Sequence, residues 1–238
     1  MEGRIYQEPS NSMLELPEVG RLKIGKKAVG NTGKEYPTSV DYFIPNGKYA
    51  DLFTQALGEK PQTIQIIFPD DAPEKVCNER YEYRDSSGAL VAYGNGRVFY
   101  VWDGARYSPY STDDHPDLMQ RLCSKYPTRR GTDNWDIVLT LRFIVPAVRG
   151  IVGVWYFSTK GAASSVMNIR NSFDAVQLMR GTVTQTVFDL SVHFHKSNKP
   201  GQSSKYPVVD LVANDNRIAD IRKEIAPTDG INLLIEKK

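Results

Sequence analysis

The chain has 238 residues, with 30 Lys and Arg against 28 Asp and Glu, and a formal net charge of +2. This length suits one large domain or two small ones. The even charge balance excludes a histone-like protein held to DNA by bulk charge, but it allows a local basic surface. The polar start and the interrupted apolar run at 143–157 indicate neither a signal peptide nor a membrane span. Cys77 and Cys123 show no pairing pattern, so we expect a cytoplasmic protein with reduced cysteines.

The first half of the chain predicts a loose arm followed by short strands. The arm covers residues 1–18, and residues 21–27 then alternate apolar and polar side chains as a half-buried strand does. A Gly/Lys-rich loop is expected at 26–38. The next predicted elements are a strand at 40–44, a helix at 49–57 ended by Gly58, and a strand at 63–68. A meander of three strands follows at 79–84, 90–93 and 98–102.

The second half begins with an irregular stretch that contains a short helix at 116–125. Strands are predicted at 136–145 and 152–158, and a helix at 162–181 follows them. Gly181 is the expected stop of this helix. Its apolar residues fall on one face: Val166, Ile169, Phe173, Val176 and Met179. The last predicted elements are a hairpin of 185–195 with 206–213, a charged helix at 217–225 and an apolar run at 231–235.

The order strand–strand–helix–strand occurs in both halves of the chain. A duplication and a coincidence of common elements both explain this order, because sequence identity between the halves is negligible. We therefore expect an α+β fold of mostly antiparallel sheets, with two ββαβ units that each pack one helix on a sheet. The expected organisation is an arm (1–18), an N-terminal β-rich unit (19–105), an irregular connector (106–134), a C-terminal ββαββ unit (135–213) and a tail (214–238).

Catalytic and metal-binding patterns are weak in this sequence. His193 and His195 alternate on one predicted strand, where solvent-facing polar residues explain them as well as metal ligands do. His115 near Cys123 lacks a second thiolate for zinc. The pair Asp70-Asp71 suits magnesium or a solvated turn. No nucleophile elbow or phosphate-binding loop is present in the sequence. We expect neither a metal, a cofactor nor catalysis.

Basic residues gather in three stretches that are interleaved with tyrosines. Such loops can follow a phosphate backbone while tyrosines stack on bases, although solvated surface lysines give the same pattern. The candidate binding residues are Lys23, Lys26, Lys27, Lys34, Arg121, Lys125, Arg129 and Arg130. The third stretch contains Lys196, Lys199 and Lys205, and the interleaved tyrosines are Tyr36, Tyr107, Tyr110 and Tyr126.

Six motifs in collinear order resemble one protein family. They are Leu16-Pro-Glu-Val-Gly-Arg-Leu-Lys-Ile-Gly25, Asp41-Tyr-Phe-Ile44, Leu57-Gly-Glu-Lys-Pro61, Ile67-Phe-Pro-Asp-Asp-Ala-Pro-Glu74, Leu139-Thr-Leu-Arg-Phe-Ile-Val-Pro146, and Asn168-Ile-Arg-Asn171 through Leu178-Met-Arg-Gly181. Together they are similar to the recombination directionality factor-like proteins of phages that encode large serine integrases. Many relatives carry a cysteine-rich stretch where this chain has Tyr107, Tyr110 and a lone Cys123, so the resemblance does not extend to a zinc site.

The resemblance implies binding rather than catalysis. Such factors attach to a large serine integrase that is already on DNA and shift it from integration toward excision. The expected partners are therefore the integrase and, through the integrase complex, DNA. Two other classes stay open: a single-stranded-DNA-binding or annealing protein of a phage replication module, and a metal-dependent hydrolase.

Overall fold

The larger β-sheet extends from one end of the molecule to the other. The computed structural model describes residues 16–30, 33–126, 135–197 and 204–214. Within these residues the sheet has eight strands in the order β2-β1-β9-β8-β4-β5-β6-β7. Among the neighbouring strands of this sheet in the described residues, only β1 and β9 are parallel, and the other neighbours are antiparallel. The bounds are β1 Glu18–Val29, β2 Glu35–Asn46, β4 Cys77–Arg84, β5 Leu90–Gly94, β6 Val98–Trp102, β7 Tyr107–Ser111, β8 Asp136–Phe143 and β9 Val154–Thr159.

A second, antiparallel sheet has the order β11-β10-β3 in the described residues. Its strands are β3 Thr63–Ile67, β10 Val187–Lys196 and β11 Lys205–Asn214. The helices are α1 Ala50–Leu57, α2 Pro73–Val76, α3 Leu118–Lys125 and α4 Met167–Arg180, and a π-helical turn at Ala162–Val166 leads into α4. This mixture of antiparallel sheets and few helices confirms the predicted α+β class.

The two halves of the chain contribute strands to both sheets. The order β1-β2-α1-β3 is followed later by β8-β9-α4-β10. The first strand of one unit pairs with the second strand of the other, β1 with β9, and the two closing strands β3 and β10 pair antiparallel. The predicted ββαβ units are therefore interleaved through shared strand pairing.

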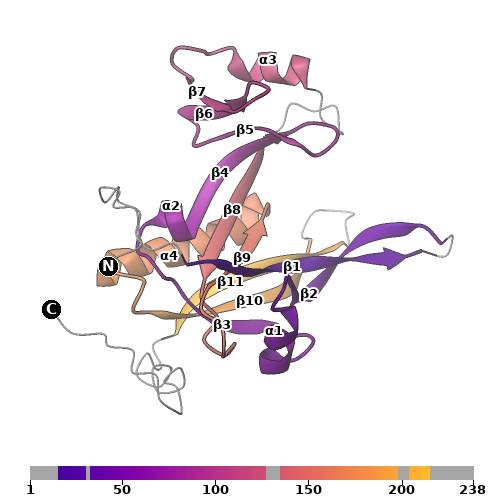
Figure 1. Cartoon of the computed structure of the whole chain (residues 1–238), viewed down its shortest axis with the longest axis vertical. Coiled ribbons are helices and arrows are strands. Elements are labelled where there is room, and N and C mark those ends of the chain that lie inside the picture. The colour runs from indigo at the N-terminus through magenta and orange to yellow at the C-terminus, as the bar shows by residue number, and fades with distance from the viewer. Residues whose placement is uncertain (1–15, 31–32, 127–134, 198–203, 215–238) are drawn as a thin grey trace, which may run out of the picture.

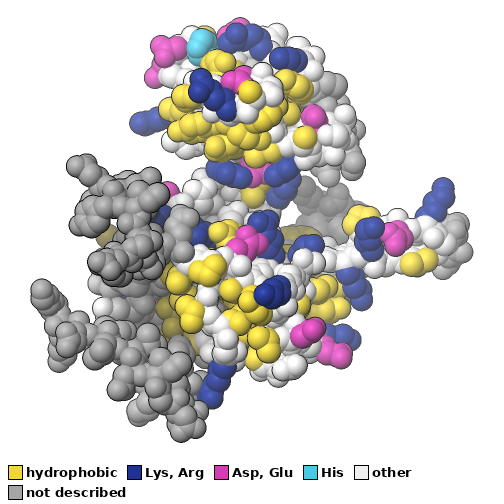
Figure 2. Space-filling model, in the orientation of Figure 1, with side chains coloured by type: hydrophobic (Ala, Val, Ile, Leu, Met, Phe, Trp, Pro, Cys, Tyr) yellow, Lys and Arg dark blue, Asp and Glu magenta, His cyan; other side chains and the backbone are white. Residues whose placement is uncertain are grey.

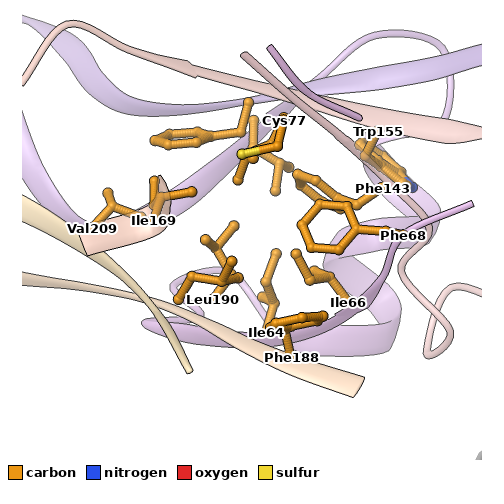
Figure 3. Close-up of a cluster of buried hydrophobic side chains, with 14 of the residues drawn as sticks. Ile64, Ile66, Phe68, Cys77, Phe143, Trp155, Ile169, Phe188, Leu190 and Val209 are labelled. Carbon is orange, nitrogen blue, oxygen red and sulfur yellow. The ribbon is translucent and has the colours of Figure 1, made fainter. Parts of the chain in front are cut away.

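The main hydrophobic core lies between the sheets and under α4 (Figure 3). Phe143 and Trp155 come from the large sheet, and Ile66 and Phe188 from the small one; all four are at most 1% exposed. The strands approach closely at Gly20, where an added Cβ would lie 2.4 Å from Cζ3 of Trp155. A side chain at this position would therefore displace the Trp155 ring from the core.

The predicted apolar face is confirmed for four of its five residues, of which Val166 lies in the π-helical turn before α4. Ile169, Phe173 and Val176 are buried, and α4 packs on β11. Met179 is 74% exposed, so its predicted place on this face was wrong. At about 100° per residue, ten residues rotate Met179 by roughly 80° from the direction of Ile169, which takes it off the buried stripe. Gly181 ends the helix with φ of 73°, as the sequence predicted.

Figure 1 shows that β5, β6, β7 and α3 form a separate upper lobe, which β4 and β8 connect to the rest of the protein. The lobe has its own core, in which Leu118 and Leu122 of α3 pack on Phe99 and Val101 of β6. The sequence analysis missed β7 and α2. The predicted helix at 217–225 and the apolar run at 231–235 lie outside the described residues.

The predicted loop at 26–38 is largely a hairpin. Strand β1 continues to Val29, and β2 begins at Glu35, with pairing up to this last residue pair. Gly33 supplies the turn with a φ of 75°. The expectation of a long loop was wrong because Tyr36, Thr38 and the apolar pair before Gly30 favour extended backbone over the loop that the lysines indicated. Figure 1 shows this hairpin projecting from the side of the molecule.

Candidate interaction surfaces

The first group of predicted site residues lies on the β1–β2 hairpin, and we call it the basic hairpin: Lys23, Lys26, Lys27 and Lys34. All four side chains are exposed. Nζ of Lys27 lies 2.7 Å from Oε2 of Glu35, and both groups are well over half exposed, so this pair contributes little to stability. The hairpin is therefore a solvated, cationic projection whose side chains keep their rotational freedom.

The second predicted group lies at the far end of the upper lobe. Arg121 and Lys125 are exposed on α3 and border a groove of about 310 Å³. Trp102, Tyr110 and Tyr126 also line it, and the last two are among the tyrosines that interleave with the basic residues in the sequence. Arg121 is paired with Asp117 at 3.0 Å. Arg129 and Arg130 lie outside the described residues. The structure thus places the basic hairpin and the α3 groove on different parts of the molecule (Figure 1).

The sequence analysis missed a third surface, on the large sheet. Cross-strand partners in a sheet project to the same side. The register pairs Arg21 with Tyr156, Tyr156 with Arg142, Glu82 with Tyr93, and Tyr93 with Tyr100. We call this side of the sheet the open face. The opposite side carries the buried Trp155, Phe157, Leu139 and Leu141 in the main core, and Phe99 and Val101 under α3.

One end of the open face is an arginine–tyrosine stack formed by Arg21, Tyr156 and Arg142. The guanidinium carbons of Arg21 and Arg142 each lie 5.4 Å from the centre of the Tyr156 ring. Nε of Arg21 also donates to Oε1 of Glu18 at 2.6 Å, and this bond lowers the pKa of Glu18. The stack therefore holds positive charge at fixed positions, since planar guanidinium groups favour the negative face of an aromatic ring.

Arg80, Glu82 and Arg84 alternate along β4 in the middle of the open face. The Glu82 carboxylate is 4% exposed and accepts hydrogen bonds from both arginines, at 2.7 and 2.8 Å. Burial alone would raise the pKa of Glu82, but these bonds and the two positive charges lower it below its ordinary value. The two guanidinium groups are partly exposed, so the trio presents a net positive charge. Cζ of Arg80 also lies 4.7 Å from the Tyr93 ring centre.

The other end of the open face is an aromatic platform of Tyr93, Tyr100, Trp102 and Tyr107 on the upper lobe. Tyr93 and Tyr100 stack with ring centres 5.3 Å apart and planes 16° apart. Tyr107 contacts both Tyr93 and Trp102 at 5.2 Å, and its hydroxyl donates to the carbonyl of Leu90 at 2.8 Å. Tyr100 is 41% and Trp102 38% exposed. Figure 2 shows hydrophobic side chains gathered on the upper lobe, with charged side chains beneath them.

The paired acids Asp70 and Asp71 tie loops together. Asp70 accepts from the backbone of Ala72 and from Lys75 at the start of α2. Oδ1 of Asp71 accepts from the Thr182 hydroxyl and from the backbone N–H groups of Val183 and Thr184. Desolvation acts to raise the pKa of Asp71, and these bonds lower it overall. The distinctive motif at 67–74 therefore fastens the turn after α4 to the segment after β3.

His193 and His195 are exposed on β10, whereas Cys77 is buried. Nδ1 of His193 lies 3.2 Å from Asp210, and the His195 ring lies beside Tyr206. Burial raises the pKa of the Cys77 thiol to about 12. No group of three or more potential metal-ligating His, Cys, Asp or Glu side chains occurs in the part of the chain that the structure describes.

Comparison with known proteins gives one match. The model of the Gp3-like family, described as recombination directionality factor-like, matches residues 19–214. These residues contain both sheets, α4 and the upper lobe. No curated protein and no solved structure matches the chain. Among the described helices, none is both long and apolar enough to cross a membrane.

Proposed function

Because the chain belongs to the recombination directionality factor-like family, we propose that it is a non-catalytic accessory protein of phage or prophage recombination. Its partner is a large serine integrase that is bound to DNA, and its effect is to bias this integrase toward excision. The observation that carries the proposal is the family match, since it covers residues 19–214, which include both sheets and all the described helices, rather than one motif.

The bias toward excision is a population shift in the integrase. A bound factor changes the balance of two conformations only by the difference in its affinity for them. A shift from 1:99 to 99:1 needs roughly a 10⁴-fold difference in affinity. The factor therefore needs a surface that contacts the integrase in one conformation and loses contacts in the other. No reacting group is required of the factor itself.

The cationic surfaces supply contacts for this role. We place the basic hairpin and the α3 groove at the complex of integrase and DNA, because exposed Lys and Arg side chains attract both phosphates and acidic protein surfaces. The hairpin projects from the molecule, so it can reach across a partner without moving the core (Figure 1). Its lysines are expected to act mainly on the association rate.

A two-way recombination assay tests the proposal. Purified integrase from the same phage or prophage is incubated with substrates for integration or for excision, with and without this protein. We expect the protein to raise excision and lower integration, and to slow the migration of integrase–DNA complexes in a gel. Unchanged rates in both directions, with no change in migration, would contradict the proposed function.

A further inference from the structure

The open face combines fixed positive charge with exposed aromatic rings in one continuous track. Starting at Arg21 on β1, the track crosses β9, β8, β4, β5 and β6 and ends at Tyr107 on β7. Six strand-to-strand steps of about 4.8 Å span about 29 Å, and the track also runs about 20 Å along β8, because β9 is met at Arg142 and Glu82 of β4 at Asp136. The track is therefore long compared with any one side chain, and each strand contributes only one to three residues to it.

The charges on the track do not cancel. The track has four positive side chains and two negative ones: Arg21, Arg142, Arg80 and Arg84 against Glu18 and Glu82. The ion pair of Lys160 with Asp136 adds no net charge. The positive excess lies at the stack and beside Glu82, and the aromatic platform begins one strand further on. An extended ligand that fits this track carries repeated negative charge along its length and presents flat apolar groups beside that charge.

We propose that the open face binds single-stranded nucleic acid. Its phosphates would lie along the arginines of the stack and of β4, and its unpaired bases would stack on the aromatic platform. Every base has a π-face, so such stacking tolerates any sequence. A duplex would leave the platform without a partner, because its bases are already stacked on one another. This binding is separate from the proposed integrase role and needs no integrase.

The aromatic platform is preorganised for stacking. Its rings hold one another at 5.2–5.3 Å, and the Tyr107 hydroxyl is anchored to the backbone of β5. Rings that are already fixed lose little rotamer freedom when a base lands on them. Tyr100 and Trp102 are the most exposed of the four, and they stand two residues apart on the same strand, so they are the positions to test.

Binding is measured with the full chain and a fluorescently labelled oligothymidine of about 20 nucleotides at low salt, by anisotropy and without integrase. We expect saturable binding that is at least tenfold tighter than binding to a duplex of the same length. Tyr100→Ala and Trp102→Ala should each weaken it by about tenfold. Tyr36→Ala is the matched control, because Tyr36 is 50% exposed on the basic hairpin, away from the open face. It should leave the affinity unchanged.

Tryptophan fluorescence adds a readout that loss of structure would not imitate. A base stacked on Trp102 should quench its emission, whereas Trp155 is buried at 1% exposure and Trp135 packs against Tyr83 and Phe99 in the core of the upper lobe. Trp102→Phe should therefore keep most of the affinity and lose most of the quenching. Arg21→Gln should reduce the slope of log affinity against log salt by about 0.7, the value for one phosphate contact with a single strand. Thermal melts confirm that each variant is folded.

The proposal fails if the oligonucleotide does not bind saturably, or if folded Tyr100→Ala and Trp102→Ala proteins bind it as tightly as the wild type does. It also fails if these variants lose only the complex with integrase, since the open face would then be a protein-docking surface built on the same Tyr, Trp and Arg anchors. Either result leaves the outcome of the recombination assay with the wild-type protein, and with it the proposed integrase role, unaffected.

Discussion

The basic hairpin and the open face both present positive charge, yet they hold it in different ways. On the hairpin, Lys26 and Lys34 extend into solvent and Lys27 makes an exposed ion pair with Glu35. On the open face, Arg21 and Arg142 lie against the Tyr156 ring, and Arg80 and Arg84 share one buried carboxylate. Loose charge suits long-range attraction, whereas fixed charge beside aromatic rings suits recognition at contact. The difference suggests separate tasks for the two surfaces.

The largest expected effect comes from opening a cavity in the main hydrophobic core. Phe173 of α4 is fully buried and packs edge-on against Phe68, with ring centres 5.1 Å apart. Phe173→Ala should lower the free energy of unfolding by about 3–5 kcal/mol, because it removes apolar burial and leaves a cavity. Denaturant unfolding measures this. Met179→Ala on the same helix is the control and should change stability by less than about 0.5 kcal/mol. Equal effects would show that α4 is not packed as described.

Glu82 holds the arginines of β4 in place on the open face. Glu82→Gln keeps the shape and removes the charge that both arginines contact. We expect a loss of about 1.5–3 kcal/mol of unfolding free energy, the usual range for hydrogen bonds that involve a charged group. Glu35→Gln on the basic hairpin is the matched control. It also removes a carboxylate from an ion pair, with Lys27, but this pair is exposed to solvent. Similar losses at both positions would remove the distinction between fixed and loose charge.

The same residue predicts a dependence on pH. The pKa of Glu82 in the folded protein lies below its ordinary value of 4.5. Its ionised form therefore stabilises the fold fully above about pH 4.5, and this contribution is lost as pH falls through the lower folded pKa. The stability difference between wild type and Glu82→Gln should be constant near neutral pH and shrink in acid. A difference that grows toward acid would contradict the assigned direction.

Sequence periodicity predicted most of the elements but not the open face. The strands and α4 could be predicted because alternation and 3.6-residue spacing are local properties of the chain. The residues of the open face come from strands that are distant in sequence, such as Arg21, Glu82, Tyr100 and Tyr156. No local sequence pattern specifies the strand register that aligns them. The alternation of Arg80, Glu82 and Arg84 in β4, and of Tyr100 and Trp102 in β6, was the available signal. The sequence analysis instead proposed the lysine-rich hairpin as a binding site, because its density of charged residues is high.

The smallest expected effect on stability is at the basic hairpin. Lys26→Glu combined with Lys27→Glu should change the free energy of unfolding by no more than about 0.5 kcal/mol, since both side chains are exposed. The association rate with integrase on DNA should nevertheless fall, because reversing charge on a projecting surface removes electrostatic attraction. Stopped-flow or surface-based kinetics at two salt concentrations measures this rate. The difference in rate between wild type and variant should narrow at the higher salt as screening increases.

The same double substitution should weaken oligothymidine binding at the open face far less than Trp102→Ala does. If the double substitution weakened oligothymidine binding as strongly as Trp102→Ala, the two surfaces would form a single site, and the division of tasks between loose and fixed charge would be wrong.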